Sequence, residues 1–353
     1  MLAGIARIAL MFVCGDRLFA EAAITFEAGA RELIASKAQR DSLGLNWFVD
    51  GNLGVLKDGG KQVMYGANGR QPFRITGTPK NPFGKVEPVT ISTSAANFAY
   101  LSGGPVYRDP ASGHLLLFYH AEIHRGGPGN FYAVLGLAIQ TDKAGLAFND
   151  LGPIFTPNVP ENQAPHAIEV CGAPFVIKDG FFYVYARDEM RDSTPRGINL
   201  ALGRAPVRDV VDAALAGKSV AWRKYYQGNF SEPALGGKST PLETGNPGTR
   251  WMDVSYNTAL HKFIIVIAAN TTPSMVELFI STSSDGIHWT ARQKLTDDDG
   301  ESFYPSIVGI GNDPRQTGNE FYIYYTFSKA GGWKRWDDAE IVRRKITFQT
   351  AKE

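Results

Sequence analysis

The chain has 353 residues, of which 44% are hydrophobic and 12% aromatic, and its 36 basic and 35 acidic side chains leave a formal net charge of +1. This hydrophobic content excludes a disordered chain, and the balanced charge, without a Lys/Arg cluster, argues against nucleic acid or an anionic membrane as a partner. The 38 glycines and 20 prolines favour a fold with many turns over a helical bundle.

The first 22 residues have the pattern of a secretory signal peptide. Arg7 precedes a short apolar run at 8–13, and the AEA sequence at 20–22 fits a cleavage site, although charged residues at 16–17 interrupt the pattern. A misplaced start codon or a frayed tail is the alternative. No stretch is long enough to span a bilayer. We therefore predict a secreted or periplasmic protein with one domain at 23–353.

A series of five β-hairpins begins at residue 54. Each hairpin joins an apolar strand to an aromatic-rich strand through a turn that contains Asp, Asn or Gly. The hairpins span 54–66, 104–120, 174–186, 253–268 and 305–327. Third strands are predicted at 131–141, 197–205, 276–283 and 340–348, and fourth strands at 88–92 and 219–226.

This imperfect repeat predicts an all-β fold, a five-bladed β-propeller. The amphipathic stretch at 207–218 predicts one short inserted helix. The last unit lacks a candidate fourth strand, so we expect the segment before the first hairpin to close the ring. A two-sheet sandwich with long loops is the alternative, but sandwiches rarely repeat one hairpin signal in this way.

Two turns carry an Asp ahead of a Gly, at 281–289 and, more loosely, at 141–148. Such an Asp caps the turn by accepting backbone N–H groups, while Gly permits a positive φ. These turns resemble the Asp-boxes of sialidases and the SxDGxxW turns of furanosidase propellers. We expect Asp285 and Asp142 to be structural.

Acidic residues precede the first strands of several hairpins. In a propeller those strands line the central channel, so residues at their entrances meet. Asp50 precedes the first hairpin, Glu169 the third and Asp253 the fourth, while Glu301 and Tyr304 precede the fifth. Because an isolated buried carboxylate is costly, we expect these groups to share a polar cavity.

Five hairpin-led blades with an acidic residue ahead of the first resemble the furanosidase propeller superfamily, glycoside hydrolase families 43, 32, 68 and 117. The sequence WFVDGNLG at 47–54 is similar to the WMNDPNG opening of the fructan hydrolases and to the DPxI start of the arabinanases. The resemblance implies that Asp50 is the nucleophile or general base. It also implies a second carboxylate from blade 3, matched by Glu169, and an acid Glu from blade 4. The candidates for that acid are Asp253 and Glu232, and neither lies in a clean family motif.

Glycoside hydrolysis needs one carboxylic acid to protonate the leaving oxygen and one carboxylate to attack the sugar or activate water. We therefore predict a glycosidase that acts on a furanoside-containing glycan, arabinan-like before fructan-like. A carbohydrate-binding propeller without catalysis is the alternative. A sialidase-like enzyme would need an arginine triad, for which Arg187 and Arg250 are too few.

Polar and aromatic residues near these carboxylates are candidates for substrate binding, since rings stack on sugars and polar groups bind hydroxyls. They are Trp47, Asn52, His166, Arg187, Asp188, Trp251, Glu301 and Tyr304. His120, Glu122 and His124 alternate along one strand, but two His and one Glu are more typical of a solvated or substrate-facing edge than of a metal site. We expect neither a metal nor a cofactor.

Overall fold

The computed structural model describes residues 23–45, 49–69, 71–95, 97–126, 130–164, 167–189, 199–242, 248–272, 275–329 and 338–351. The predicted signal segment at 1–22, Trp47 and His166 lie outside these ranges. Among the described residues, no helix has the length and apolar character needed to cross a membrane.

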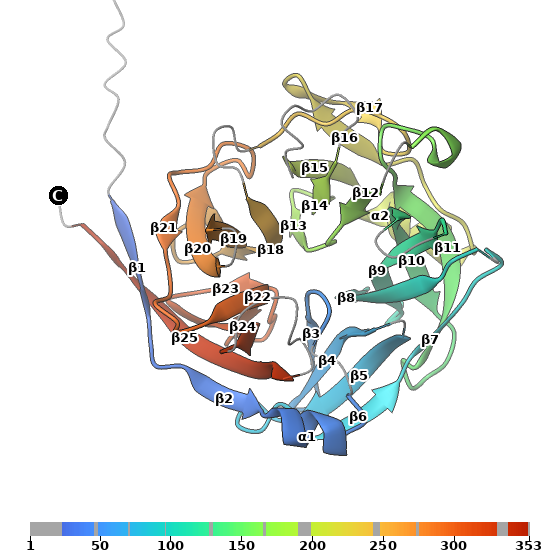
Figure 1. Cartoon of the computed structure of the whole chain (residues 1–353). Coiled ribbons are helices and arrows are strands. Elements are labelled where there is room, and N and C mark those ends of the chain that lie inside the picture. Colours follow the sequence, from blue (N-terminus) through green and yellow to red (C-terminus); the bar gives the residue numbers. More distant parts are fainter. Residues whose placement is uncertain are drawn as a thin grey trace, which may run out of the picture.

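The strands form five groups arranged in a ring around a common centre (Figure 1). The first group contains β3 (Gly54–Asp58), β4 (Lys61–Asn68), β5 (Gln71–Gly77) and β6 (Lys85–Pro88). The second contains β8 (Tyr100–Arg108), β9 (Leu115–His124), β10 (Phe131–Gln140) and β11 (Ala147–Phe155), with β7 (Thr90–Ser92) parallel to β11. The third contains β12 (Ile168–Cys171), β13 (Phe175–Lys178), β14 (Phe181–Asp188), β15 (Asn199–Pro206), β16 (Arg223–Tyr226) and β17 (Asn229–Pro233).

The fourth group contains β18 (Thr249–Asn257), β19 (Lys262–Thr272), β20 (Met275–Ser283) and β21 (Gln293–Lys294), with β23 (Gln316–Thr317) beside β18. The fifth contains β22 (Glu301–Gly309), β24 (Glu320–Ser328) and β25 (Glu340–Thr350), together with β1 (Ile24–Ala28) and β2 (Glu32–Ala35). A short parallel pairing of β10 with β12 joins the second and third groups into one hydrogen-bonded sheet. Figure 1 shows β3, β8, β13, β18 and β22 nearest the centre.

The prediction of an all-β chain built on five hairpins is confirmed. The antiparallel pairs are β3–β4, β8–β9, β13–β14, β18–β19 and β22–β24. The predicted third strands are β10, β15, β20 and β25. Of the predicted fourth strands, 219–226 shortens to β16.

The prediction of one strand at 88–92 is wrong, because the chain crosses from the first strand group to the second inside this stretch. The N–H of Val89 donates to Pro72 in the first group, whereas the N–H of Thr90 donates to Leu146 in the second. Val89 itself is fully buried. Residues 85–88 therefore end the first group as β6, and 90–92 join the second as β7.

The inserted helix is α2 (Val207–Leu215), with Val210, Val211 and Ala214 on its buried face. A second helix, α1 (Lys37–Ser42), was not predicted because its six residues are mostly polar and show no apolar period. A capping box starts α1: Ser36 and Gln39 each accept the other's backbone N–H through a side-chain oxygen.

The segment before the first hairpin completes the fifth group, as predicted. β1 pairs antiparallel with β25 from Ile24 opposite Thr350 to Ala28 opposite Ile346. The buried carboxylate of Asp298 also joins the two ends of the chain, because it accepts from Arg31 at 2.9 Å and from Arg344 at 2.7 Å. The first and last strands are thus neighbours at the rim of one group.

The two Asp turns are capped as predicted, and each contacts the preceding neighbour in the ring. Asp285 Oδ1 accepts from the N–H groups of Ile287 and His288, both at 2.8 Å. Tyr185, on β14 of the third group, donates to Gly286 O at 2.9 Å. Gly286 has φ +77°, and a Cβ there would lie 2.6 Å from the tyrosine hydroxyl. Tyr65 and Gly145 repeat this contact between the first and second groups.

Candidate functional site

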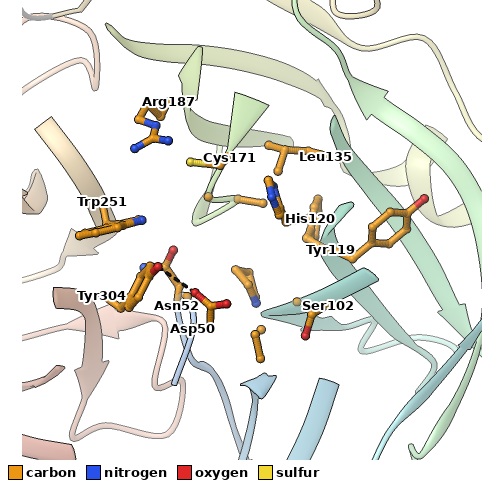
Figure 2. A pocket seen from close by; sticks show the side chains of 18 of the residues that line it. Asp50, Asn52, Ser102, Tyr119, His120, Leu135, Cys171, Arg187, Trp251 and Tyr304 are labelled. Atoms are coloured by element: carbon orange, nitrogen blue, oxygen red, sulfur yellow. Dashed lines mark hydrogen bonds between the residues drawn. The ribbon is translucent and has the colours of Figure 1, made fainter. Parts of the chain in front are cut away.

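A cavity of about 370 Å³ lies where the five strand groups converge (Figure 2). This volume is in the usual range for small-molecule sites. Residues from every group line it. The polar and aromatic residues that matter for chemistry are Asp50, Asn52, Tyr100, His120, Glu122, Glu169, Arg187, Arg250, Trp251 and Tyr304.

Asp50 lies four positions before the start of β3 and is held at both carboxylate oxygens. Oδ1 accepts from the hydroxyl of Tyr304 at 2.8 Å, and Oδ2 accepts from the hydroxyl of Tyr100 at 3.0 Å. Its own N–H donates to Ala67 on β4, which fixes the backbone. Burial raises the pKa of Asp50, and the two tyrosine hydrogen bonds offset only part of that rise. The group is therefore positioned for proton chemistry closer to neutral pH than an exposed Asp.

Tyr304 reaches Asp50 from a strained backbone position. Its φ is +48°, and the register of β22 against β24 shifts between Phe303 and Ser306. A non-glycine residue in this region costs about 1 kcal/mol or more, and such positions cluster at functional sites. The ring of Trp251 packs on that of Tyr304 with centroids 4.3 Å apart. The irregular strand thus directs the tyrosine hydroxyl toward the cavity.

Asn52 ties three groups together beneath the cavity. Its side-chain amide donates to Met252 O at 2.8 Å and to Pro305 O at 2.7 Å. The residue is buried. Since an Asn side chain has two amide hydrogens, both are used within the protein, and Oδ1 alone remains for a ligand.

Glu169 and Arg187 form an ion pair on the wall built by the third group. Arg187 Nη2 contacts Glu169 Oε1, and Arg187 Nη1 lies 3.4 Å from the main-chain oxygen of Arg250. Burial lowers the pKa of Arg187 to about 10.

Glu122 is the third carboxylate of the cavity, and it is held by two histidines. His120 Nε2 lies 3.2 Å from Oε1, and His124 Nε2 lies 2.7 Å from Oε2. Burial raises the pKa of Glu122, but the hydrogen bonds with both imidazoles outweigh this effect and leave the pKa lowered. Among the described residues, no cluster of three or more His, Cys, Asp or Glu could hold a metal ion.

Asp253 does not share this cavity, contrary to our expectation. β18 begins at Thr249, so Arg250 and Trp251 line the cavity and Asp253 lies further along the strand. Its oxygens accept from the N–H groups of Val254 at 2.8 Å and Ile307 at 2.5 Å, beside a separate space of about 30 Å³. Burial raises its pKa to about 7.

Glu232 was assigned to the wrong strand group. It lies on β17, the last strand of the third group, opposite Lys224 on β16. Its Oε2 accepts from the N–H of Lys238 at 3.2 Å. It does not line the cavity, because the β16–β17 hairpin is at the outer end of its group.

Asp188 follows Arg187 on β14 and points away from the cavity. Its Oδ2 accepts from Lys224 Nζ at 2.8 Å and from the hydroxyl of Ser239. Lys224 and Asp188 are 0% and 1% exposed at their side chains, so this is a buried ion pair of the third group. Glu301, at the start of β22, is also buried and is not part of the cavity wall.

The cavity thus brings together six of the predicted site residues: Asp50, Asn52, Glu169, Arg187, Trp251 and Tyr304. Sequence reasoning left Tyr100 and Arg250 out of the site, and it gave His120 and Glu122 only as part of a solvated or substrate-facing edge. The alternation in YHAEIH, which places His120 and Glu122 on one side of β9, was the available signal.

The sequence matches no family model and no curated protein. Solved structures do match the fold. A GH62 α-L-arabinofuranosidase catalytic domain from Coprinopsis cinerea aligns at TM-score 0.56 and 10% identity, covering 93% of this chain and 98% of that one. A family 117 glycoside hydrolase from Zobellia galactanivorans aligns at TM-score 0.56 and 9% identity, with 92% and 90% covered. An N-acetylgalactosamine deacetylase from F. plautii aligns at 0.50 and 14%, with 94% and 95% covered.

The resemblance to furanosidase-type glycoside hydrolases that the hairpin pattern indicated is therefore confirmed for the fold. At these identities the likeness concerns the arrangement of the strands.

Proposed function

We propose that the chain is a five-bladed β-propeller glycoside hydrolase that cleaves a furanoside-containing glycan, arabinan-like before fructan-like, in the central cavity. The observation that carries this proposal is the convergence of Asp50, Glu122 and Glu169 from three strand groups on one cavity. A tryptophan and two arginines in the same wall suit a sugar ring and its hydroxyls.

Asp50 takes the role of general base or nucleophile. Either role requires an ionised carboxylate in a fixed orientation, and the hydroxyls of Tyr304 and Tyr100 hold one oxygen each. A pKa raised by burial strengthens the carboxylate as a proton acceptor. The support for this role is geometric, since Asp50 faces the cavity and is reached by donors on two sides.

The proton for the leaving oxygen comes from the pair formed by His120 and Glu122. Asp253 and Glu232 are outside the cavity, and Glu169 is paired with Arg187. His120 and Glu122 both line the cavity, and a positioned imidazole is the commonest general acid or base in enzymes. Glu169 then acts as an auxiliary charge that orients Arg187.

The first test compares wild type with Asp50→Asn on arabinan, arabinogalactan, fructan and xylan, with Asp142→Asn as the control. Asp142 caps a turn outside the cavity, so its replacement changes the same atoms without touching the site. We expect Asp50→Asn to lose about a thousandfold or more in kcat/KM, while the control retains activity. Full activity in Asp50→Asn would remove this mechanism.

A second test separates the acid from the base. An aryl furanoside with a good leaving group needs little protonation, so His120→Gln should cleave 4-nitrophenyl α-L-arabinofuranoside far better than arabinan, relative to wild type. Asp50→Asn should lose both activities. Equal losses of His120→Gln on both substrates would contradict the assigned donor.

The second candidate function is a carbohydrate-binding protein without catalysis. It is favoured by the partners of the two cavity carboxylates other than Asp50. Glu169 is paired with an arginine, and Glu122 is hydrogen-bonded to two histidines. In that case the wild type should bind oligosaccharides, with a change in tryptophan fluorescence, and release no product from any substrate of the panel.

We also propose that the protein is exported, on the pattern of its first 22 residues. Expression of the full chain followed by N-terminal sequencing of the extracytoplasmic protein tests this. Cleavage after residue 22 is expected, and retention of the intact chain in the cytoplasm would contradict it.

A further inference from the structure

We propose that the sugar bound in this cavity carries a carboxylate, as a uronic acid does, and that Arg250 binds that carboxylate. This inference rests on the proposed function, in that the cavity is taken as the sugar site. Arg250 is the second residue of β18 and lines the cavity beside Trp251.

An irregularity in β18 brings Arg250 and Trp251 to the cavity together. Successive residues of a regular strand point to opposite faces, so two neighbours would not normally share a wall. The register of β18 against β19 shifts between Thr249 and Trp251, and such bulges redirect side chains at functional sites. A ring that can stack on a sugar therefore lies next to a cation.

The guanidinium of Arg250 is oriented but not saturated. Its Nε donates to Asn270 Oδ1 on β19, which anchors the planar group. Among the residues that the structure describes, none accepts a hydrogen bond from Nη1 or Nη2 of Arg250. A guanidinium with free Nη groups presents a planar set of donors that matches a carboxylate.

A second guanidinium adds positive charge to the same wall. Arg187 is 6% exposed, lines the cavity, and approaches the main chain of Arg250. In the described parts of the chain, its Nε is buried and has no hydrogen-bond partner. Glu169 contacts Arg187, and the charge of Glu189 also acts on Arg187, whereas no carboxylate of the described residues forms an ion pair with Arg250.

Asp50 lies across the cavity from Arg187 (Figure 2). Asp50 and Glu122 therefore differ from the arginines in their partners. Asp50 and Glu122 are hydrogen-bonded to tyrosines and histidines, whereas Arg187 contacts Glu169. Arg250 repels Arg187 and has no ion-pair partner of its own among the described residues, so an anion beside Arg250 would be favoured. A carboxylate on the ligand supplies that anion, whereas a neutral sugar does not.

The test uses three probes that share one ring: D-glucuronic acid, its methyl ester and D-glucose. Binding is measured by calorimetric titration near neutral pH with wild type, Arg250→Gln, Arg250→Lys and the control Arg223→Gln. Arg223 lies on β16, exposed and outside the cavity. Circular dichroism confirms that each variant folds.

We expect wild type to bind the acid about tenfold or more tightly than the ester or glucose. Arg250→Gln should lose this preference, and Arg223→Gln should keep all of it. Arg250→Lys should keep part of it, because lysine retains the positive charge but lacks the planar guanidinium. Equal affinity for acid and ester in wild type, an undiminished preference in Arg250→Gln, or no binding of the acid at millimolar concentration would each overturn the inference.

The outcome is separable from that of the proposed function. Asp50-dependent hydrolysis of neutral arabinan without any preference for the acid would overturn the uronate inference and leave the hydrolase. A preference for the acid that depends on Arg250, in a protein that hydrolyses no glycan, would support the inference and overturn the hydrolase.

Discussion

The hydroxyl of Tyr304 donates to the carboxylate of Asp50 at 2.8 Å, although the two residues are 254 positions apart in the sequence. Tyr100, on β8 of the second group, donates to the other oxygen. The carboxylate thus meets the first, second and fifth groups at one point. Its protonation depends on the balance between burial, which favours the neutral acid, and two donors, which favour the anion.

Removing one donor should shift the pH dependence of activity. In Tyr304→Phe the anion of Asp50 loses a hydrogen bond, so the pKa of Asp50 rises further. Because the proposed role needs the ionised form, the acid limb of the kcat/KM profile should move to higher pH, with about a tenfold loss on that limb. Tyr322→Phe, on β24 outside the cavity, is the control. An acid limb that does not move in Tyr304→Phe would contradict this role of Asp50.

Asp253 should make stability fall as pH rises. Its folded pKa is about 7, against 3.8 for the free side chain, because it is buried. Between these values the folded chain holds a proton that the unfolded chain releases, so this stabilising contribution is complete below about pH 4 and lost by about pH 7. Urea unfolding at several pH values should show a flatter profile for Asp253→Asn, whose amide does not titrate. Parallel profiles for the two proteins would exclude the effect.

The buried pair of Asp188 and Lys224 should be sensitive to removal of either partner. Lys224 Nζ also donates to Thr156 O at 2.8 Å and Gly237 O at 3.0 Å, so it is fully enclosed. Asp188→Ala leaves this ammonium without its counter-charge and should cost about 3–5 kcal/mol in the free energy of unfolding. A double variant, Asp188→Ala with Lys224→Met, should lose less than the sum of the single changes in urea unfolding. Additive losses would show that the two charges do not interact.

The closure of the fifth group should weaken when Asp298 loses its charge. Asp298 accepts from Arg31, Arg344 and the hydroxyl of Tyr325. Asp298→Asn should lower the unfolding free energy by about 1–3 kcal/mol and speed limited proteolysis near residues 29–31. Asp297→Asn is a matched control, because the neighbouring side chain is 91% exposed. Similar behaviour of both variants would mean that the network does not hold the ends.

The strands could be predicted because each hairpin carries its own local signal of turn residues and alternating apolar and aromatic positions. The site residues were harder to predict, since a shift of one position along a strand reverses the face to which a side chain points. Arg187 faces the cavity and Asp188 faces Lys224, although both were assigned to substrate binding. The bulge in β18 likewise brings Arg250 and Trp251 to the cavity and leaves Asp253 deeper along the strand.

Two residues were not assigned to the site because they come from a strand that was not expected to reach the centre. His120 and Glu122 lie at the end of β9, a second strand, whereas first strands alone were taken to line the channel. Glu232 was misplaced because the third group carries an extra helix and the β16–β17 hairpin, for which the repeat offers no template.

The pairing of β1 with β25 has a consequence during synthesis. Strand 24–28 is synthesised before the other strands that the structure describes, yet its partner at 340–350 is synthesised after them. The nascent protein therefore carries an unpaired β-edge until translation of β25, and ribosome-bound chains that stop before residue 340 should need chaperones to avoid aggregation.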